Sequence, residues 1–298
     1  MSLLDFIQPV PPDVAIEIDS AHVAVARLAR HGSSSTVAAH VVEALPPGVV
    51  VPGLAAANIS DVPAVAGAIQ QALARLGGRV ARAALVIPDT AAKVSLIRFE
   101  KVPPNTADLV ELVRWQVRKS APFPLDQAVI SFTPGIKPDD GGQEFVVTTA
   151  RVDVVEQYEQ ACTQAGVHAG LIDIATFSIL NGVLTAGAAP AGDWLLVHAT
   201  PTYTTLAVLR GGELIFFRNR EEESGGTLAD VVHQTAMYYE DRLKGTGFSR
   251  VLLAGGAVQG VDAVRRSLEQ RLDVRIEAVA HPDLASLVGI LSRERKVA

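Results

Sequence analysis

The chain has 298 residues, of which 49% are hydrophobic, so it can bury a large core and is expected to fold as two lobes rather than stay disordered. Its net charge of −6 and its dispersed basic residues argue against specific binding to DNA or RNA. The single cysteine, Cys162, excludes a disulfide within the chain and lies in a helical pattern, where we expect a small buried thiol rather than a nucleophile.

No segment has the length and apolar character of a membrane-spanning helix, and the first residues lack the basic region and cleavage site of a secretory signal. We therefore expect a cytoplasmic protein. Within residues 1–8, four apolar side chains could form a turn that touches a membrane or a partner weakly, and the alternative is a packed or frayed terminus.

The first predicted elements form an α/β lobe. Residues 14–28 alternate apolar and polar on either side of a polar tip at 19–22, which predicts a β-hairpin, and a third strand is expected near 38–42. Apolar residues at helical spacing predict a helix over 62–76, which a glycine pair ends before a strand at 81–88.

A similar series recurs in the second half. The pattern predicts a hairpin at 193–209, a strand at 213–220, a helix at 227–243, a short strand at 250–254 and a helix at 261–272. The chain therefore looks like two related lobes, each opening with a hairpin whose tip could face the other lobe.

Residues 94–172 differ from both lobes. Their pattern predicts a strand, a helix over 107–119 that two prolines stop, two strands joined by the polar loop KPDDGGQ, and a helix over 154–165. We interpret them as an α+β module inserted into the first lobe. The first lobe would then comprise residues 1–93 and 173–191, and the second lobe residues 192–298.

Two long phrases of the sequence carry a family resemblance. RFEKVPPNTADLVELVRWQVRKSAPFPLDQAVISF and VVTTARVDVVEQYEQACTQAGVHAGLIDIATFSILNGV resemble the PilM family of type IV pilus assembly proteins, and more distantly FtsA and the cytoplasmic part of GspL. The resemblance covers nearly the whole chain. It implies the actin-like, RNase H-like fold, in which a nucleotide lies between the two hairpins and the inserted module replaces the second small subdomain of actin.

The first hairpin departs from the family pattern. Where the family has Asp, an apolar residue and Gly, followed by Lys, this chain has Glu17, Ile18 and Asp19, followed by Ala24. A carboxylate thus stands where the backbone should approach a phosphate, and the basic residue is lost. Such a carboxylate about 4 Å from a phosphate oxygen would cost roughly 4 kcal/mol, or about a thousandfold in affinity.

The second hairpin departs as well. The family's Asp, apolar residue and Gly correspond to His198, Ala199 and Thr200, and Pro201 then removes a backbone donor. The carboxylate that would hold a metal is therefore absent. No second ligand follows His198 at a metal-binding spacing, so we expect a histidine held at a strand end and no metal site.

Two further features bear on the nucleotide. The turn AGGAVQG, with Gly255 and Gly256, resembles the family's adenosine-binding turn, although the strand-to-helix turn needs glycine whether or not adenine binds. Only EEESGG separates Arg220 from Thr227, where PilM relatives have a second small subdomain. We infer that this subdomain is lost and that the cleft is open there.

These features lead to a hypothesis about function. The chain is expected to be a scaffold of a type IV pilus or related secretion machine, without a cofactor and without ATPase activity. The resemblance implies that it binds the cytoplasmic N-terminal peptide of PilN or a similar single-span inner-membrane protein. The resemblance implies a groove between the first lobe and the module, for which Trp115 and Phe123 are candidate anchors. One alternative is an ATP-binding switch, in which magnesium neutralises Asp19, and another is a polymer-former like FtsA.

Overall fold

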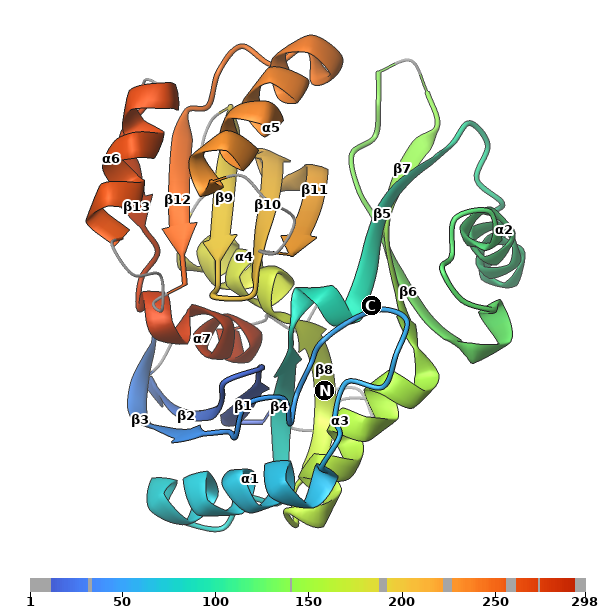
Figure 1. Cartoon of the computed structure of the whole chain (residues 1–298). Helices are drawn as coiled ribbons and strands as arrows, with labels where there is room; N and C mark the ends of the chain where they lie inside the picture. The colour runs from blue at the N-terminus through green and yellow to red at the C-terminus, as the bar shows by residue number, and fades with distance from the viewer. Residues whose placement is uncertain are drawn as a thin grey trace.

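The computed structural model describes residues 12–31, 34–139, 141–187, 192–221, 227–255, 261–272 and 274–292. Within these ranges the chain forms two five-stranded sheets, one three-stranded sheet and seven α-helices (Figure 1). The apolar turn expected within residues 1–8 lies outside the described residues.

The first lobe is built on a sheet of strand order β3-β2-β1-β4-β8. Strands β1, β2 and β3 are antiparallel neighbours, whereas β4 runs parallel to β1 and β8 runs parallel to β4. The predicted hairpin and the first predicted helix are both confirmed. The elements of the lobe are β1 (Val14–Ile18), β2 (His22–His31), β3 (Ser34–Ala44), α1 (Val62–Leu76), β4 (Arg82–Ile87), α3 (Val152–Gln164) and β8 (His168–Ile174).

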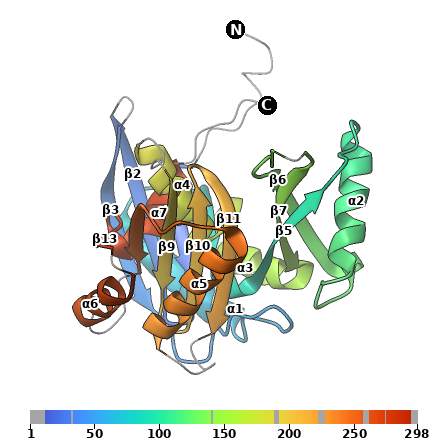
Figure 2. The same cartoon turned by 90° about the horizontal axis from the view of Figure 1, so that it is seen from above.

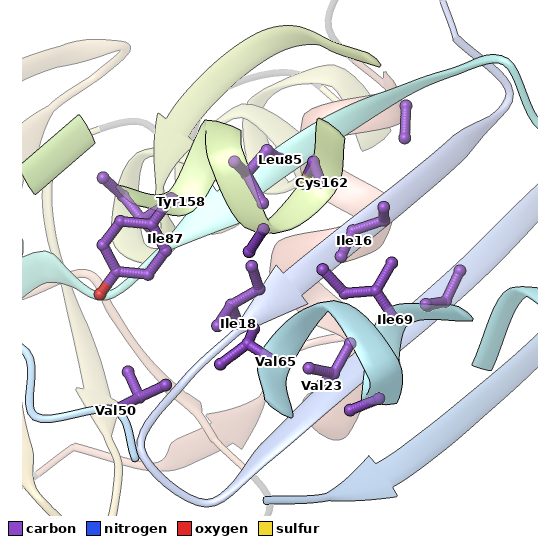
Figure 3. Packing of buried hydrophobic residues seen from close by; sticks show 14 of the residues in the cluster. Ile16, Ile18, Val23, Val50, Val65, Ile69, Leu85, Ile87, Tyr158 and Cys162 are labelled. Carbon is purple, nitrogen blue, oxygen red and sulfur yellow. The ribbon is translucent and has the colours of Figure 1, made fainter. Parts of the chain in front are cut away.

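Helix α1 begins at a side-chain cap, and its apolar face is buried against the sheet. The Asp61 side chain accepts a hydrogen bond of 3.0 Å from the Ala64 amide, which satisfies one of the free donors at the helix start. Val65 and Ile69, four residues apart, then pack in one core with Ile16 and Ile18 of β1 (Figure 3).

Helix α3 and strand β8 belong to the first lobe, which corrects the predicted module boundary of 94–172. Tyr158 and Cys162 of α3 are buried in the same core as α1 (Figure 3), and β8 pairs with β4. Strand β7 ends at Arg151 and α3 begins at Val152, so no loop marks the return to the lobe. The module therefore comprises about residues 92–151. Cys162 is confirmed as a buried thiol, and burial raises its pKa to about 12.

The second lobe repeats the topology of the first. Its sheet has the order β11-β10-β9-β12-β13, with an antiparallel three-stranded half followed by two parallel strands. Only residues 222–227 separate β11 from α5, too few for a second small subdomain. The elements are β9 (Asp193–Ala199), β10 (Tyr203–Arg210), β11 (Glu213–Glu221), α5 (Leu228–Leu243), β12 (Arg250–Ala254), α6 (Val261–Leu272) and β13 (Ile276–Ala278).

Two helices cross between the lobes, α4 (Ala175–Ala186) and α7 (Ala285–Ser292) (Figure 1). Helix α7 buries Leu287 and Ile290 against the first sheet, although it lies within the predicted second lobe of 192–298. Helix α4 instead buries Ile179 and Leu180 against the second sheet. Each lobe is thus covered by a helix that sequence order assigns to the other lobe.

The crossing point is a contact between glycines. A Cβ atom on Gly182 would lie 3.0 Å from Gly289 Cα, and one on Gly289 would lie 1.8 Å from the Ser178 carbonyl oxygen. Only residues without a side chain allow the two backbones to approach this closely.

The inserted module consists of a three-stranded sheet of order β5-β7-β6 and one covering helix (Figure 2). Val113 and Val117 of the helix pack against Phe145 and Val147 of the sheet. The elements are β5 (Ala92–Phe99), α2 (Thr106–Arg118), β6 (Ala128–Pro134) and β7 (Gln143–Arg151). Among all described helices, none combines the length and hydropathy needed to cross a bilayer.

Candidate functional site

A cavity of about 30 Å³ lies between the tips of the two hairpins. This volume holds about one or two water molecules, whereas pockets for cofactors usually exceed about 300 Å³. The cavity brings together four predicted site residues, Glu17, Asp19, His198 and Thr200. Its full lining comprises Glu17, Ile18, Asp19, Ser20, Pro88, His198, Thr200, Thr202 and Tyr203.

The tip of the first hairpin is closed by its own carboxylate. Asp19 Oδ1 accepts hydrogen bonds of 2.7 Å from the amides of Ala21 and His22, and His22 Nδ1 lies 3.2 Å away. An aspartate that binds the backbone two or three residues ahead stabilises a tight turn. The Ala21 and His22 amides are therefore occupied by an anion of the chain itself.

The tip of the second hairpin is closed in a similar way by a hydroxyl group. Thr200 Oγ1 accepts hydrogen bonds from the amides of Thr202, at 3.3 Å, and Tyr203, at 3.0 Å. The Thr200 amide donates to the Tyr203 carbonyl at 2.9 Å. Pro201 has no N–H group, and the amides of Thr200, Thr202 and Tyr203 all donate to acceptors within the tip itself.

Glu17 is the penultimate residue of β1 and lines the cavity. Ser286, on α7, donates a hydrogen bond of 2.9 Å to Glu17 Oε1. Burial and then the neighbouring Asp19 charge raise the pKa of Glu17 above its ordinary value, despite the opposing effect of the Ser286 hydrogen bond. A carboxyl that resists ionisation is a poor ligand for a magnesium ion.

A polar network beneath the cavity was missed in the sequence, and it centres on Asp89. This residue follows β4 in a short 3₁₀ turn and is fully buried. Its carboxylate accepts hydrogen bonds from the Thr176 amide at 2.8 Å, from the Thr176 hydroxyl, and from the Thr205 hydroxyl at 2.6 Å. The network therefore joins β4, α4 and β10.

His198 belongs to this network. Its Nδ1 atom lies 2.9 Å from Thr176 Oγ1 and 3.4 Å from Asp89 Oδ2. Because the Thr176 hydroxyl already donates to Asp89, His198 Nδ1 must carry the proton and donate. Burial alone would raise the pKa of Asp89, but hydrogen bonds from His198 and Thr176 and the charge of His198 outweigh burial and lower it. The predicted strand-end histidine is thus satisfied by the fold.

The two candidate partner anchors of the module do not share a surface. Phe123 is buried, with 9% of its area exposed, whereas Trp115 is 55% exposed. On a helix with about 3.6 residues per turn, Trp115 lies roughly 160° from the buried Val113 and Val117. Its ring therefore points away from the sheet, and Lys119 Nζ lies 3.6 Å from the ring centroid.

A sequence profile of the family described as type IV pilus assembly protein PilM matches residues 15–235. The chain belongs to this family. No curated protein matches it.

Several solved structures of low sequence identity share the fold of this chain. The PilM-PilN type IV pilus biogenesis complex contains a chain that matches with a TM-score of 0.81 and 18% identity, over 96% of this chain and 99% of that one. A protein of actin-like ATPase fold from Bacteroides thetaiotaomicron gives a TM-score of 0.56 and 7% identity, over 98% and 100%. The ethanolamine utilization protein EutJ from Carboxydothermus hydrogenoformans gives a TM-score of 0.54 and 13% identity, over 96% of this chain and 91% of EutJ. The predicted actin-like fold is confirmed.

The glycine turn of this PilM-family chain has a structural role. Gly255 has a φ of +100°, and a Cβ atom there would lie 1.9 Å from the Ala199 carbonyl oxygen. Any side chain at this position would separate β12 from the end of β9. Gly256 lies outside the described residues.

Proposed function

We propose that this PilM-family chain is an assembly scaffold of a type IV pilus or a related secretion machine. In this proposal it binds the cytoplasmic N-terminal peptide of a PilN-like, single-span inner-membrane protein and does not hydrolyse ATP. Family membership and the likeness to a chain of the PilM-PilN complex support the pilus role. The state of the two hairpin tips supports the absence of ATP chemistry.

One observation carries the nucleotide part of the proposal. Asp19 and Thr200 each occupy two backbone amides of their own hairpin tip, at 2.7 Å for Asp19 and 3.0–3.3 Å for Thr200. A phosphate would have to displace both and then lie beside the Asp19 carboxylate. Magnesium at a nucleotide usually takes one or two carboxylates beside the phosphates, but Glu17 has a raised pKa and the second hairpin presents His198 in place of a carboxylate. The residues present therefore do not fit magnesium ATP.

A thermal-shift titration with magnesium ATP tests this part. Binding tighter than about 100 μM would stabilise the protein by about 1.4 kcal/mol at about 1 mM ATP, which raises the melting temperature measurably. We expect no rise. A clear rise, or magnesium-dependent hydrolysis, would favour the ATP switch instead, and sedimentation of filaments would favour an FtsA-like polymer.

The junction between the first lobe and the module supports the partner part of the proposal. The Arg151 guanidinium, at the end of β7, donates to the Ala55 carbonyl in the loop after β3, so the two units meet there. Exposed apolar side chains flank the junction: Val51 of that loop is 63% exposed and Val129 of β6 is 44% exposed. Val129 pairs across the sheet with Ala150, which packs in the first-lobe core.

Calorimetry with a synthetic peptide tests the junction. The probe is the cytoplasmic N-terminal peptide of a PilN-like, single-span inner-membrane protein encoded in the same genome. We expect Val51→Asp and Val129→Asp each to weaken binding at least about tenfold, since a buried charge replaces an apolar contact. Val42→Asp on β3, where the side chain is 49% exposed, is the matched control. A wild-type protein that ignores the peptide would refute the partner assignment.

A further inference from the structure

The outer face of α2 exposes a tryptophan to solvent. Trp115 is 55% exposed, and it lies on the side of the helix opposite the module sheet. The helix itself forms the outermost layer of the module, with the sheet between it and the second lobe (Figure 2). Large aromatic side chains that remain exposed commonly mark interfaces, because they bury much apolar area at little entropic cost.

One pair of opposite charges flanks Trp115 symmetrically on this face. Glu111 lies four residues before it and Lys119 four residues after it, and both side chains are exposed. Asp108 extends the acidic half, and Arg118 extends the basic half. A helix with this pattern is complementary to itself when the second copy runs in the opposite direction.

We propose that the outer face of α2 binds α2 of a second copy of this chain, antiparallel and about a twofold axis at Trp115. The two tryptophans would then meet at the axis, and Glu111 of each copy would face Lys119 of the other. An isologous contact of this kind buries the same patch on both subunits. This inference is independent of the proposed loss of ATP chemistry and of the partner peptide.

An anionic membrane fits the same face less well. A membrane-binding helix carries basic residues along its polar face, whereas Asp108 and Glu111 make half of this face acidic. The net charge of −6 also disfavours approach to anionic lipid. A contact made by a single helix face falls at the small end of protein interfaces, so we expect micromolar affinity.

Sedimentation velocity from about 5 to about 500 μM tests the proposal, since it covers the range expected for a small interface. We expect a concentration-dependent dimer that Trp115→Ala weakens at least about tenfold. Glu111→Lys and Lys119→Glu should each weaken it similarly, and the double variant should restore it because the pair is exchanged. Glu240→Lys on α5 is the matched surface control, and thermal melts of all variants report folding.

Cross-linking tests the direction of pairing. A mixture of the Glu111→Cys and Lys119→Cys proteins, treated with a short bis-maleimide, should yield mixed dimers faster than either protein alone. The native Cys162 is buried and should not react. Faster cross-linking of either protein with itself would overturn the antiparallel arrangement.

Three results would overturn the surface itself. The first is a wild-type protein that stays monomeric up to about 500 μM, well above the affinity expected for the contact. The second is a dimer that Trp115→Ala leaves unchanged. The third is binding to phosphatidylglycerol vesicles that Trp115→Ala abolishes in a monomeric protein, which would assign the face to the membrane.

Discussion

Thr205 in the second lobe donates a hydrogen bond of 2.6 Å to Asp89, which follows β4 of the first lobe. The two residues are 116 positions apart in the chain, and both are fully buried. Asn219 Nδ2 in turn donates to Thr205 Oγ1 at 2.8 Å. Neither buried group can reach water, so removing one partner leaves the other without its hydrogen bond. The lobes are therefore joined by fixed polar geometry at the base of the cleft.

Replacing Asp89 with asparagine should destabilise the protein. Asp89→Asn removes the charge that three donors and His198 surround, and the new amide group would face hydroxyls that already donate. We expect a loss of roughly 2–4 kcal/mol in the free energy of unfolding, measured with urea. Asp126→Asn, at an exposed position, is the control. Equal stability of both variants would show that the network contributes little.

The effect of Asp89→Asn should depend on pH. The pKa of Asp89 is lower in the folded protein than its unfolded value of about 3.9. The ionised group therefore stabilises the fold fully above the unfolded pKa. This contribution is lost as the pH falls through the folded pKa. Urea unfolding at several pH values from about 3 to about 6 should therefore show the gap between wild type and variant closing in acid. A constant gap would mean that the charge is not the cause.

Glu17 should behave in the opposite sense. The pKa of Glu17 is higher in the folded protein than its unfolded value of about 4.3, so the folded protein binds the carboxyl proton more tightly. The free energy of unfolding therefore falls as the pH rises from about 4.3 to the folded pKa. Glu17→Gln keeps an oxygen for Ser286 and removes the buried charge. The variant should be more stable than wild type near neutral pH, and the gain should vanish near about pH 4. Glu240→Gln should show no such gain, and a destabilised Glu17→Gln would contradict the assignment.

The helix crossing gives a steric prediction. Gly289→Ala would bring a methyl group to 1.8 Å from the Ser178 carbonyl oxygen, so the backbones of α4 and α7 must separate. We expect a loss of roughly 2–4 kcal/mol in unfolding free energy. Gly67→Ala in α1 is the matched control, since a Cβ there meets nothing within 4 Å. That change should instead stabilise the protein by about 0.5–1 kcal/mol.

The hydrophobic pattern predicted most of the secondary structure, because its period distinguishes strands from helices. The structure confirms the predicted helix over 62–76 and the predicted hairpin tip at 19–22. The assignment of α7 failed for a physical reason. Residues 285–292 form a short apolar helix whose burial depends on the first sheet, and nothing local in the sequence indicates which sheet a helix will cover.

The candidate site was predicted in part. The hairpin residues Glu17, Asp19, His198 and Thr200 line one cavity, because two hairpins of matching topology face each other. Asp89 was missed, since a lone aspartate after a proline is an ordinary turn signal. Its partners Thr176 and Thr205 come from distant segments, and only the fold brings them together. A carboxylate one proline beyond the buried strand segment LVI was the available signal.

The crossed helices also set the order in which the protein can mature. Strand β1 is translated well before α7, the helix that covers its alanine side. The first lobe therefore cannot be completed until residues 285–292 have been made, and its apolar face stays uncovered until then. Nascent chains arrested before residue 285 should be cleaved by protease within the first sheet, and full-length chains should resist. Both lobes are expected to mature together, once residues 285–292 are available.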